Sequence, residues 1–193
     1  MIKINKPTFF KNTRYEEASL SQIELSEHEA DIISSWIFKP KNILFMSSTP
    51  GIGKTYICSA VINHYYQKNL PIYYVSECEL LDKVSGYIND GRNALGEWQN
   101  LCDNYFMIWD DLGSSRTNSR YKELSPWLAD LFFVFLEKRI DYQLPTIITS
   151  NYSIEELKTF FNDRVISRLS SDENTIIHLR GPDRRKNLFK EPK

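Results

Sequence analysis

The sequence is poor in several features that would each indicate a particular class of protein. It has three cysteines, Cys58, Cys78 and Cys102, and no C-x-x-C pair. This spacing argues against zinc and against a disulfide-stabilised secreted fold. No run approaches the roughly 20 apolar residues that cross a membrane, and the first seven residues lack the apolar core of a signal peptide. We therefore expect a cytoplasmic protein without a membrane partner.

The chain also lacks a strong net charge, internal repeats and low-complexity segments. Its net charge is −1, and 41% of its 193 residues are apolar. A chain of this length fits one globular domain that buries roughly 70% of its unfolded surface. Residues 164–193, however, contain eight Lys and Arg against four acids. A basic end of this kind can face phosphates or form a solvated tail, and taken alone the charge pattern favours the tail.

The most informative feature that is present is a phosphate-binding loop. The run Ser48-Thr49-Pro50-Gly51-Ile52-Gly53-Lys54-Thr55 follows the apolar residues 43–46, and helical spacing begins at Tyr56. It matches G-x-x-x-x-G-K-[ST] between a strand and a helix, except that Ser48 replaces the usual glycine. The two glycines let successive N–H groups point inward, and the helix N-terminus favours an anion. A glycine-rich loop of structural use is the alternative.

Each residue of this loop has an expected role in binding a nucleotide. Lys54 is expected to reach the β- and γ-phosphates, and Thr55 to place its hydroxyl on Mg²⁺. The other residues expected to surround the nucleotide are Ser48, Thr49, Pro50, Gly51, Ile52, Gly53 and Tyr56. Serine lacks the freedom of glycine at positive φ, so Ser48 should distort the loop slightly without abolishing binding.

Two carboxylates follow a predicted apolar strand at residues 105–109. In P-loop ATPases, the strand beside the loop delivers one Asp to the Mg²⁺ shell, and the adjacent acid polarises the attacking water. Asp110 fits the first role, and Asp111 stands where many such enzymes carry Glu. Because aspartate is one methylene shorter, water would sit farther from it, and we expect slow hydrolysis. A pair of helix N-cap residues after a buried strand is the alternative.

Two further signals complete the chemical pattern. The predicted strand 146–150 ends at Asn151, whose amide can bind the γ-phosphate or the attacking water, although Asn there also forms turns. Arg164 and Arg168 stand at i and i+4 on one helical face and carry the planar donors that suit phosphate. We predict that Arg168 acts on a neighbouring subunit's nucleotide, with Arg164 as its substitute or structural partner. A surface salt bridge is the alternative.

The order of the predicted elements indicates an α/β fold. Helices are expected at residues 26–38, 54–67, 77–88, 94–102, 121–140 and 154–161, and strands at 42–47, 70–75, 105–109, 146–150 and 175–179. Continuously apolar strands that alternate with helices predict a parallel sheet covered on both faces. We divide the chain into a lead-in with a helix (1–40), a nucleotide-binding core (41–185) and a basic tail (186–193).

Together, these motifs resemble the AAA+ ATPases of the DnaC/DnaI helicase-loader and IstB transposition-helper group. The resemblance runs from about residue 9 to residue 185 and includes the lead-in 10–15, Pro-Gly-x-Gly-Lys-Thr, Asp-Asp-Leu-Gly, Thr-Ser-Asn and Arg-Val-Ile-Ser-Arg-Leu. It implies an ASCE-type P-loop NTPase, a three-layer sandwich with a parallel five-stranded sheet in the order 5-1-4-3-2 and no C-terminal lid domain. It also implies ATP with Mg²⁺, assembly into a helical or ring oligomer, and single-stranded DNA along the inner surface.

The resemblance also suggests where DNA would bind. Family members use an aromatic residue in the helix after the second strand and a Ser-x-Tyr after the acidic loop. Tyr87 and the run Ser119-Arg120-Tyr121 stand at matching places. Aromatic rings that stack on bases beside a cation are typical of single-strand binding. The alternative is that Tyr87 packs in the core and Tyr121 begins a helix.

The function expected from these residues is that of an ATPase acting in DNA replication. We expect slow, assembly- or DNA-stimulated hydrolysis, with a replicative helicase or transposase as partner. The alternative, suggested by Ser48 and Asp111, is a nucleotide-dependent interaction module with little hydrolysis that regulates such a partner. A nucleotide kinase is disfavoured because no arginine-bearing lid follows the core, and a GTPase because no Asn-Lys-x-Asp motif is present. Only about forty residues precede the first strand, whereas helicase loaders carry an extra N-terminal domain that grips the helicase and transposition helpers carry a helical clamp. Either another surface contacts the partner, or the chain is a compact loader-like ATPase from a mobile element or phage.

Overall fold

A five-stranded parallel sheet forms the centre of the computed structural model, which describes residues 10, 13, 15–70, 72–89, 98–99, 102–117 and 125–185. Its strands run in the order β2-β3-β4-β1-β5, and all neighbouring pairs are parallel. This is the predicted order 5-1-4-3-2 read from the other edge. The strands are β1 (Ile43–Ser47), β2 (Tyr73–Ser76), β3 (Met107–Leu112), β4 (Thr146–Ser150) and β5 (Thr175–His178).

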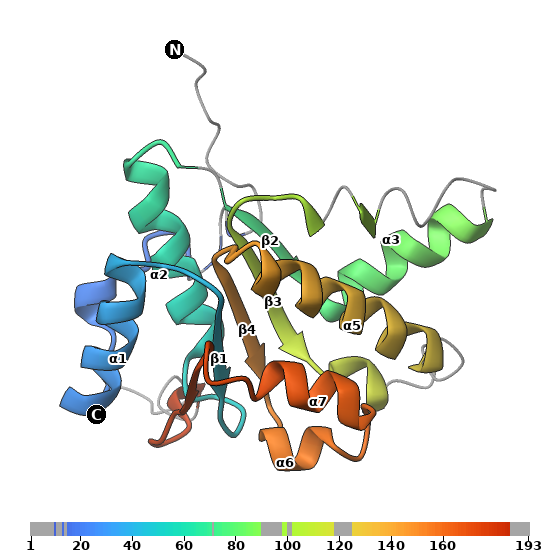
Figure 1. The fold of residues 1–193 in the computed structure, drawn as a ribbon. Coiled ribbons are helices and arrows are strands. Elements are labelled where there is room, and N and C mark those ends of the chain that lie inside the picture. The colour runs from blue at the N-terminus through green and yellow to red at the C-terminus, as the bar shows by residue number, and fades with distance from the viewer. Residues whose placement is uncertain are drawn as a thin grey trace.

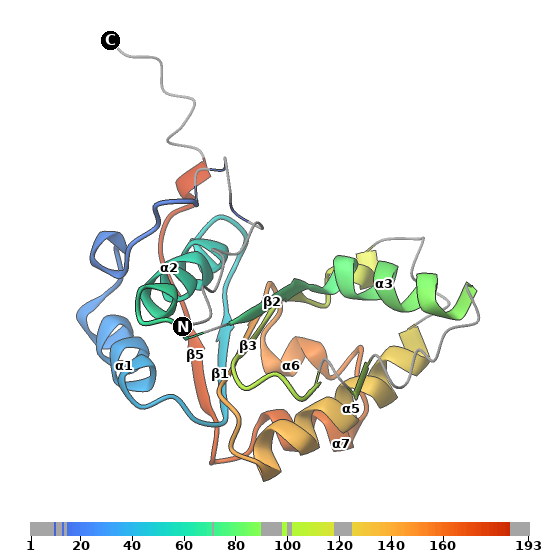
Figure 2. The same ribbon diagram turned by 90° about the horizontal axis from the view of Figure 1, so that it is seen from above.

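Helices cover both faces of the sheet (Figures 1 and 2). They are α1 (Glu27–Phe38), α2 (Lys54–Gln67), α3 (Glu77–Asn89), α5 (Ser125–Asp141), α6 (Ile154–Leu157) and α7 (Asp163–Leu169), with the 3-10 helices η2 (Leu20–Gln22) and η3 (Ser114–Thr117). In Figure 2, α1 and α2 lie on one side of the sheet and α5 and α7 on the other. The result is the predicted three-layer sandwich of an α/β protein.

The central strands are mainly apolar because each of their faces packs against a separate core. In β1, which is buried along its whole length, Leu44 and Met46 pack with α1 and α2. Ile43 and Phe45 point the other way and pack with α5 and α7. Successive side chains of a strand face opposite sides, so a strand buried on both faces has no polar alternation.

Several elements begin or end at residues other than those predicted. β2 was expected from Leu70, but the backbone N–H of Leu70 donates to Tyr65 in a turn that ends α2. β3 continues to Leu112, so Asp110 and Asp111 belong to the strand and do not follow it. The helix expected at 154–161 ends at Leu157, and the predicted helix at 94–102 lies mostly outside the described residues.

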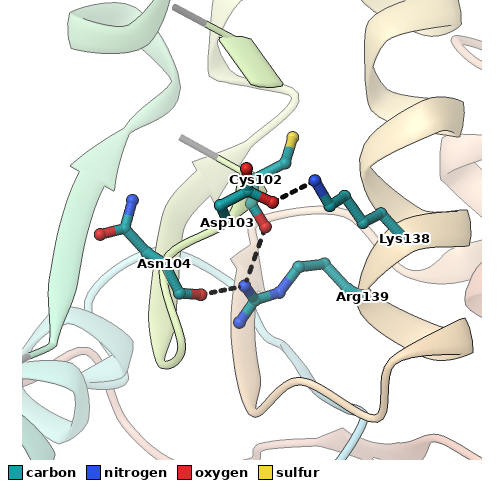
Figure 3. A network of polar contacts seen from close by, with 5 residues as sticks. All are labelled: Cys102, Asp103, Asn104, Lys138 and Arg139. Carbon is teal, nitrogen blue, oxygen red and sulfur yellow. Dashed lines mark hydrogen bonds and ion pairs between the residues drawn. The ribbon is translucent and has the colours of Figure 1, made fainter. Parts of the chain in front are cut away.

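A fully buried arginine fastens the amino ends of two strands. Arg139 of α5 donates to Thr146 Oγ1 (2.6 Å) and to the carbonyls of Cys102 (3.3 Å), Asn104, Tyr105 (3.0 Å) and Pro145 (2.6 Å). Figure 3 shows its bonds to Cys102 and Asn104 beside the ion pair of Lys138 with Asp103. Burial lowers the pKa of Arg139 to about 10, so it stays charged at neutral pH. The loops entering β3 and β4 are thereby tied to α5.

No helix in the described ranges is both long enough and apolar enough to cross a membrane.

Candidate functional site

The predicted phosphate-binding loop joins β1 to α2. Gly51 and Gly53 have φ angles of 91° and 116°, in the region that favours glycine. A Cβ atom on Gly51 would lie 1.9 Å from Asp183 Oδ1, so this position also excludes a side chain by lack of space. Ser48 is not among the residues with positive φ, so its backbone carries none of the strain expected for serine.

Lys54, the first residue of α2, is held over the loop by oxygen atoms. Its Nζ donates to Ser48 O (3.0 Å), Ser48 Oγ (2.8 Å) and Asn151 Oδ1 (2.8 Å). Ser48 therefore contributes a hydroxyl that glycine could not. Burial lowers the pKa of Lys54, and the charges of Asp111 and Asp110 oppose this shift. The amine is placed where it can bind an anion in the loop.

Asp110 of β3 lies opposite Thr55 and is surrounded by hydroxyl donors. Thr55 Oγ1 donates to Asp110 Oδ2 at 3.0 Å, and Tyr74 OH donates to the same oxygen at 2.8 Å. Thr149 Oγ1 donates to Oδ1. Carboxylate and hydroxyl oxygens are the ligands that Mg²⁺ prefers, so the pair Thr55 and Asp110 fits a magnesium ion. Tyr74 and Thr149 were not predicted, because Tyr and Thr within apolar strands are typical of a packed sheet.

Asp111 is directed by an irregularity in β3. The register between β3 and β4 shifts between Trp109 and Leu112, and Asp111 adopts a left-handed φ of 64°. Its backbone N–H donates to Thr149 Oγ1 (2.9 Å) and its Oδ1 accepts from Asn151 Nδ2 (2.6 Å). Burial raises the pKa of Asp111, and the charge of Asp110 adds to this effect. A β-bulge at a strand end commonly redirects a side chain in this way.

Asn151 connects the lysine to the second acid. Its amide oxygen accepts from Lys54 and its amide nitrogen donates to Asp111, so one side chain bridges α2 and β3. Parallel strands bring their carboxyl ends to one edge of a sheet, which explains why residues 54, 110, 111 and 151 meet. The sequence prediction that these residues form one group is consistent with this geometry.

These residues line one cavity of about 690 Å³, within the size range of pockets for small ligands. From the loop and its helix, the lining residues are Pro50, Gly51, Gly53, Lys54, Thr55 and Tyr56; the strand ends add Ser76, Asp110, Asp111 and Asn151. Ser48, Thr49 and Ile52, which were also predicted to surround the ligand, do not line it. Ser48 and Ile52 belong to the loop but are buried.

Two segments that sequence reasoning did not assign to the site complete the wall of the cavity. Tyr15, Gln22 and Glu24 come from the lead-in, and Arg184 and Arg185 come from the C-terminal side of β5. The backbone N–H of Arg184 donates to Gly51 O (3.1 Å), and its Nη2 donates to Glu24 O. Figure 2 shows the end of the coloured ribbon beside the lead-in, above α2. Of the basic residues between 164 and 193, Arg184 and Arg185 therefore face the cavity.

The two arginines of α7 lie elsewhere. Neither lines this cavity; both are exposed and lie against α5. Arg168 Nη2 forms an ion pair with Glu137 Oε1 at 2.7 Å, which is the alternative that the sequence left open. The Arg164 guanidinium stacks over the Phe133 ring at 4.1 Å. Within one chain, therefore, neither arginine reaches the residues around Lys54.

The residues predicted to contact DNA are not tested by this geometry. Tyr87 lies within α3, but its side chain is outside the described residues. Ser119, Arg120 and Tyr121 fall wholly outside them.

Comparison with solved structures confirms the fold. A crystal structure of DnaI matches with a TM-score of 0.67 and 21% identity, covering 89% of this chain and 92% of that one. A crystal structure of the DnaC helicase loader matches at 0.70 and 20%, covering 86% and 99%. The replication initiator DnaA bound to AMPPCP and single-stranded DNA matches at 0.72 and 14%, covering 90% and 52%. At these identities, the likeness shows a shared fold.

Sequence comparisons identify the family. The replicative helicase loader DnaI of Bacillus subtilis (strain 168) is 26% identical over 144 residues, which is 73% of this chain and 43% of DnaI. The match thus spans less than half of the relative's length. The model of the family described as IstB-like ATP binding protein matches residues 5–177, which is most of the chain. The phosphate-binding loop, the paired aspartates and Asn151 all lie within that range, and the chain belongs to the IstB-like ATP-binding protein family.

Proposed function

We propose that this chain is an ATP-dependent AAA+ protein of the helicase-loader type, which binds ATP with Mg²⁺ and assembles on single-stranded DNA in replication. One observation carries the proposal. Lys54, Thr55, Asp110 and Asn151 gather on one cavity, whereas Arg168 is exposed on α7, away from that cavity. Because neither arginine of α7 reaches this cavity within one chain, a second copy is suited to bring its α7 arginine to the site.

The residues that line the cavity would each have a separate role in ATP hydrolysis. Lys54 and the N-terminus of α2 would bind the phosphates, and Thr55 and Asp110 would hold Mg²⁺. Bound Mg²⁺ supplies positive charge that offsets the charge of the phosphates. Asp111 would orient the attacking water, with Asn151 beside it to contact the γ-phosphate. Arg184 and Arg185 bring further positive charge to the same wall.

Arg168 would contribute from the neighbouring subunit. Its ion pair with Glu137 is partly exposed, with 44% and 37% of the two side chains accessible. Exposed pairs of this kind contribute about 1 kcal/mol or less, so a bound phosphate can replace the carboxylate as partner. Arg164 is held against the Phe133 ring, which supports a structural role for it.

The proposed partners follow from the relatives. The curated relative is named a replicative helicase loader, and the DnaA structure contains single-stranded DNA. We propose a replicative helicase or a transposase as the partner of this chain, and DNA contacts by Tyr87, Ser119, Arg120 and Tyr121. The oligomer would be helical or a ring, since Arg168 and the cavity belong to different surfaces and a heterologous interface repeats.

A specific observation favours a second candidate, a nucleotide-dependent interaction module with little hydrolysis. The short Asp111 side chain is already engaged by Asn151 at 2.6 Å, and Asn151 is also bonded to Lys54. The contact occupies one of the two carboxylate oxygens of Asp111 and so limits how the side chain can turn toward an attacking water. A protein that keeps the contact would bind ATP, change its assembly state and hydrolyse slowly.

The two candidates are separated by measuring assembly and turnover in parallel. For the loader, light scattering should show a mass increase that requires both Mg-ATP and oligo-dT, and oligo-dT should stimulate ATP hydrolysis. Asp111→Ala should lower that stimulated rate by about a hundredfold, because loss of a general base costs at least that much. Lys54→Ala should abolish assembly. Assembly with turnover at background, unaffected by Asp111→Ala, would instead establish the interaction module.

A further inference from the structure

We propose that Tyr74 is a positioning residue for Asp110 in metal-dependent nucleotide binding, and that the lead-in supports it through Phe10. This inference rests on the proposed function, because it takes Asp110 as part of the Mg²⁺ site.

The contact between Tyr74 and Asp110 is direct and buried. Tyr74 lies on β2, paired with Ile108 of β3, and its hydroxyl donates to Asp110 Oδ2 at 2.8 Å. The same oxygen accepts from Thr55 Oγ1 at 3.0 Å. Tyr74 and Asp110 are 7% and 4% exposed, so water does not readily replace this donor. The phenol therefore helps to fix the direction of the oxygen that faces Thr55.

The Tyr74 ring is itself held by aromatic neighbours. The Phe10 ring packs edge-on against it at 4.9 Å, Tyr15 against Phe10 at 5.6 Å, and Tyr56 near Tyr15 at 6.5 Å. Tyr15 and Tyr56 both line the nucleotide cavity. A series of edge-packed rings thus leads from the cavity wall to the carboxylate of Asp110. A packed aromatic side chain has only two rotatable angles, so its hydroxyl is firmly placed.

Removal of this hydroxyl should weaken Mg²⁺ binding more than it weakens binding of the nucleotide. Phe at position 74 would keep the ring and its packing but leave Asp110 Oδ2 with Thr55 as its remaining hydroxyl donor among the described contacts. Residues that orient metal ligands typically change metal affinity by about 10- to 100-fold when mutated. Phosphate binding by the loop backbone and Lys54 does not involve Tyr74 and should persist.

The chain offers a matched control. Tyr65 is also a buried tyrosine, 6% exposed, in the same core between the sheet and α2. Its hydroxyl donates to the carbonyl of Ile37 at 2.6 Å and takes no part in the cavity. Tyr65→Phe therefore deletes the same chemical group from the same core without touching Asp110.

The experiment titrates Mg²⁺ against binding of a fluorescent ATP analogue to the full chain, with thermal unfolding measured for each variant. Tyr74→Phe should need about tenfold more Mg²⁺ for half-maximal binding, while its binding in EDTA stays as in the unaltered protein. Tyr65→Phe should show the unaltered Mg²⁺ dependence. Phe10→Leu, which keeps the hydroxyl but loosens the ring, should shift the Mg²⁺ dependence in the same direction by a smaller factor.

Each outcome bears on the proposal. An unchanged Mg²⁺ dependence in a folded Tyr74→Phe protein, or an equal shift in Tyr65→Phe, would overturn the role of Tyr74 and leave the proposed function intact. If Tyr74→Phe did not fold, an unshifted Phe10→Leu would overturn it as well. Mg²⁺-independent binding by the unaltered protein would overturn both this inference and the proposed magnesium site.

Discussion

Single side chains around the cavity are hydrogen-bonded to one another, and a ligand must replace some of these hydrogen bonds when it binds. Lys54 is shared between Ser48 and Asn151, and Asn151 also holds Asp111. A phosphate that binds Lys54 must compete with these oxygens, and the exchange would release Asn151 from the lysine. Under the proposed function, Asn151 would respond to the nucleotide and pass that response to Asp111.

Gly51 shows most directly how one residue limits the site. Alanine there would adopt a φ of 91° and place Cβ 1.9 Å from Asp183 Oδ1, so the loop or the Asp183 side chain must move. We expect Gly51→Ala to weaken nucleotide binding by about tenfold, from roughly 1 kcal/mol of backbone strain together with the displaced contact. Fluorescent nucleotide titration measures this loss.

Gly181 provides the comparison for that variant. It also has a positive φ, 147°, but a Cβ atom there meets nothing within 4 Å. Gly181→Ala should leave nucleotide affinity within about twofold, since its strain acts on stability and not on the loop. Adding Asp183→Ala to Gly51→Ala should recover part of the lost affinity; equal losses in the two glycine variants would refute the steric argument.

A site residue could be predicted from the sequence when it belongs to a contiguous motif. Lys54 and Thr55 belong to one contiguous motif, and Asp110 and Asp111 end one apolar strand, so their grouping was accessible from sequence. Tyr74 was not, because it contacts Asp110 on another strand, 36 residues later in the sequence. Arg184 and Arg185 reach the cavity only through the fold of the chain after β5.

At the scale of elements, the strands and their order were predicted well, and the residues at which strands begin and end less well. β4 and α2 have the predicted bounds because strong apolar or helical patterns coincide with clear stops. β3 extends three residues beyond its prediction, since paired carboxylates were taken as the end of a strand. The bulge that turns Asp111 depends on its pairing with β4, which a single strand's sequence does not reveal.

The hydrogen bonds of Arg139 predict that the free energy of unfolding depends strongly on the junction between α5 and the loops that enter β3 and β4. Truncation of this fully buried side chain to Ala would remove a donor from the buried carbonyl of Cys102 and from the part-buried carbonyl of Tyr105, while Pro145 O would keep the N–H of Met107 at 3.1 Å. We expect Arg139→Ala to lower the free energy of unfolding by about 3 kcal/mol or more, because each buried unsatisfied group costs about 1–3 kcal/mol. Urea denaturation measures the change.

The adjacent Lys138 supplies the control for this measurement. Its ion pair with Asp103 is partly exposed, with 31% and 58% of the two side chains accessible. Lys138→Ala should therefore cost about 1 kcal/mol or less. A similar loss in the two variants would mean that the buried carbonyls find other donors and that Arg139 does not fasten these loops.

For the whole molecule, the separation between the nucleotide cavity and α7 predicts that activity belongs to an interface between copies. A mixture of two inactive variants tests this directly. Arg168→Ala keeps an intact cavity, and Asp111→Asn keeps an intact arginine; each alone should hydrolyse little ATP. When they are mixed on oligo-dT, an Arg168→Ala cavity can meet the arginine of an Asp111→Asn neighbour. We expect roughly a quarter of the unaltered rate to return, the share of correctly ordered pairs in a random heterologous assembly.

In the same assay, the Arg164→Ala variant shows which of the two arginines acts on the neighbouring site. Its guanidinium is stacked at 4.1 Å on Phe133 of its own chain, so we expect Arg164→Ala to retain most hydrolysis without any mixing. If Arg164→Ala were inactive and recovered on mixing with Asp111→Asn, while Arg168→Ala remained active alone, Arg164 would be the arginine that enters the neighbouring site. If neither variant recovered on mixing, the cavity would be complete within one subunit. Arg184 and Arg185, which already line the cavity, would then be its source of positive charge.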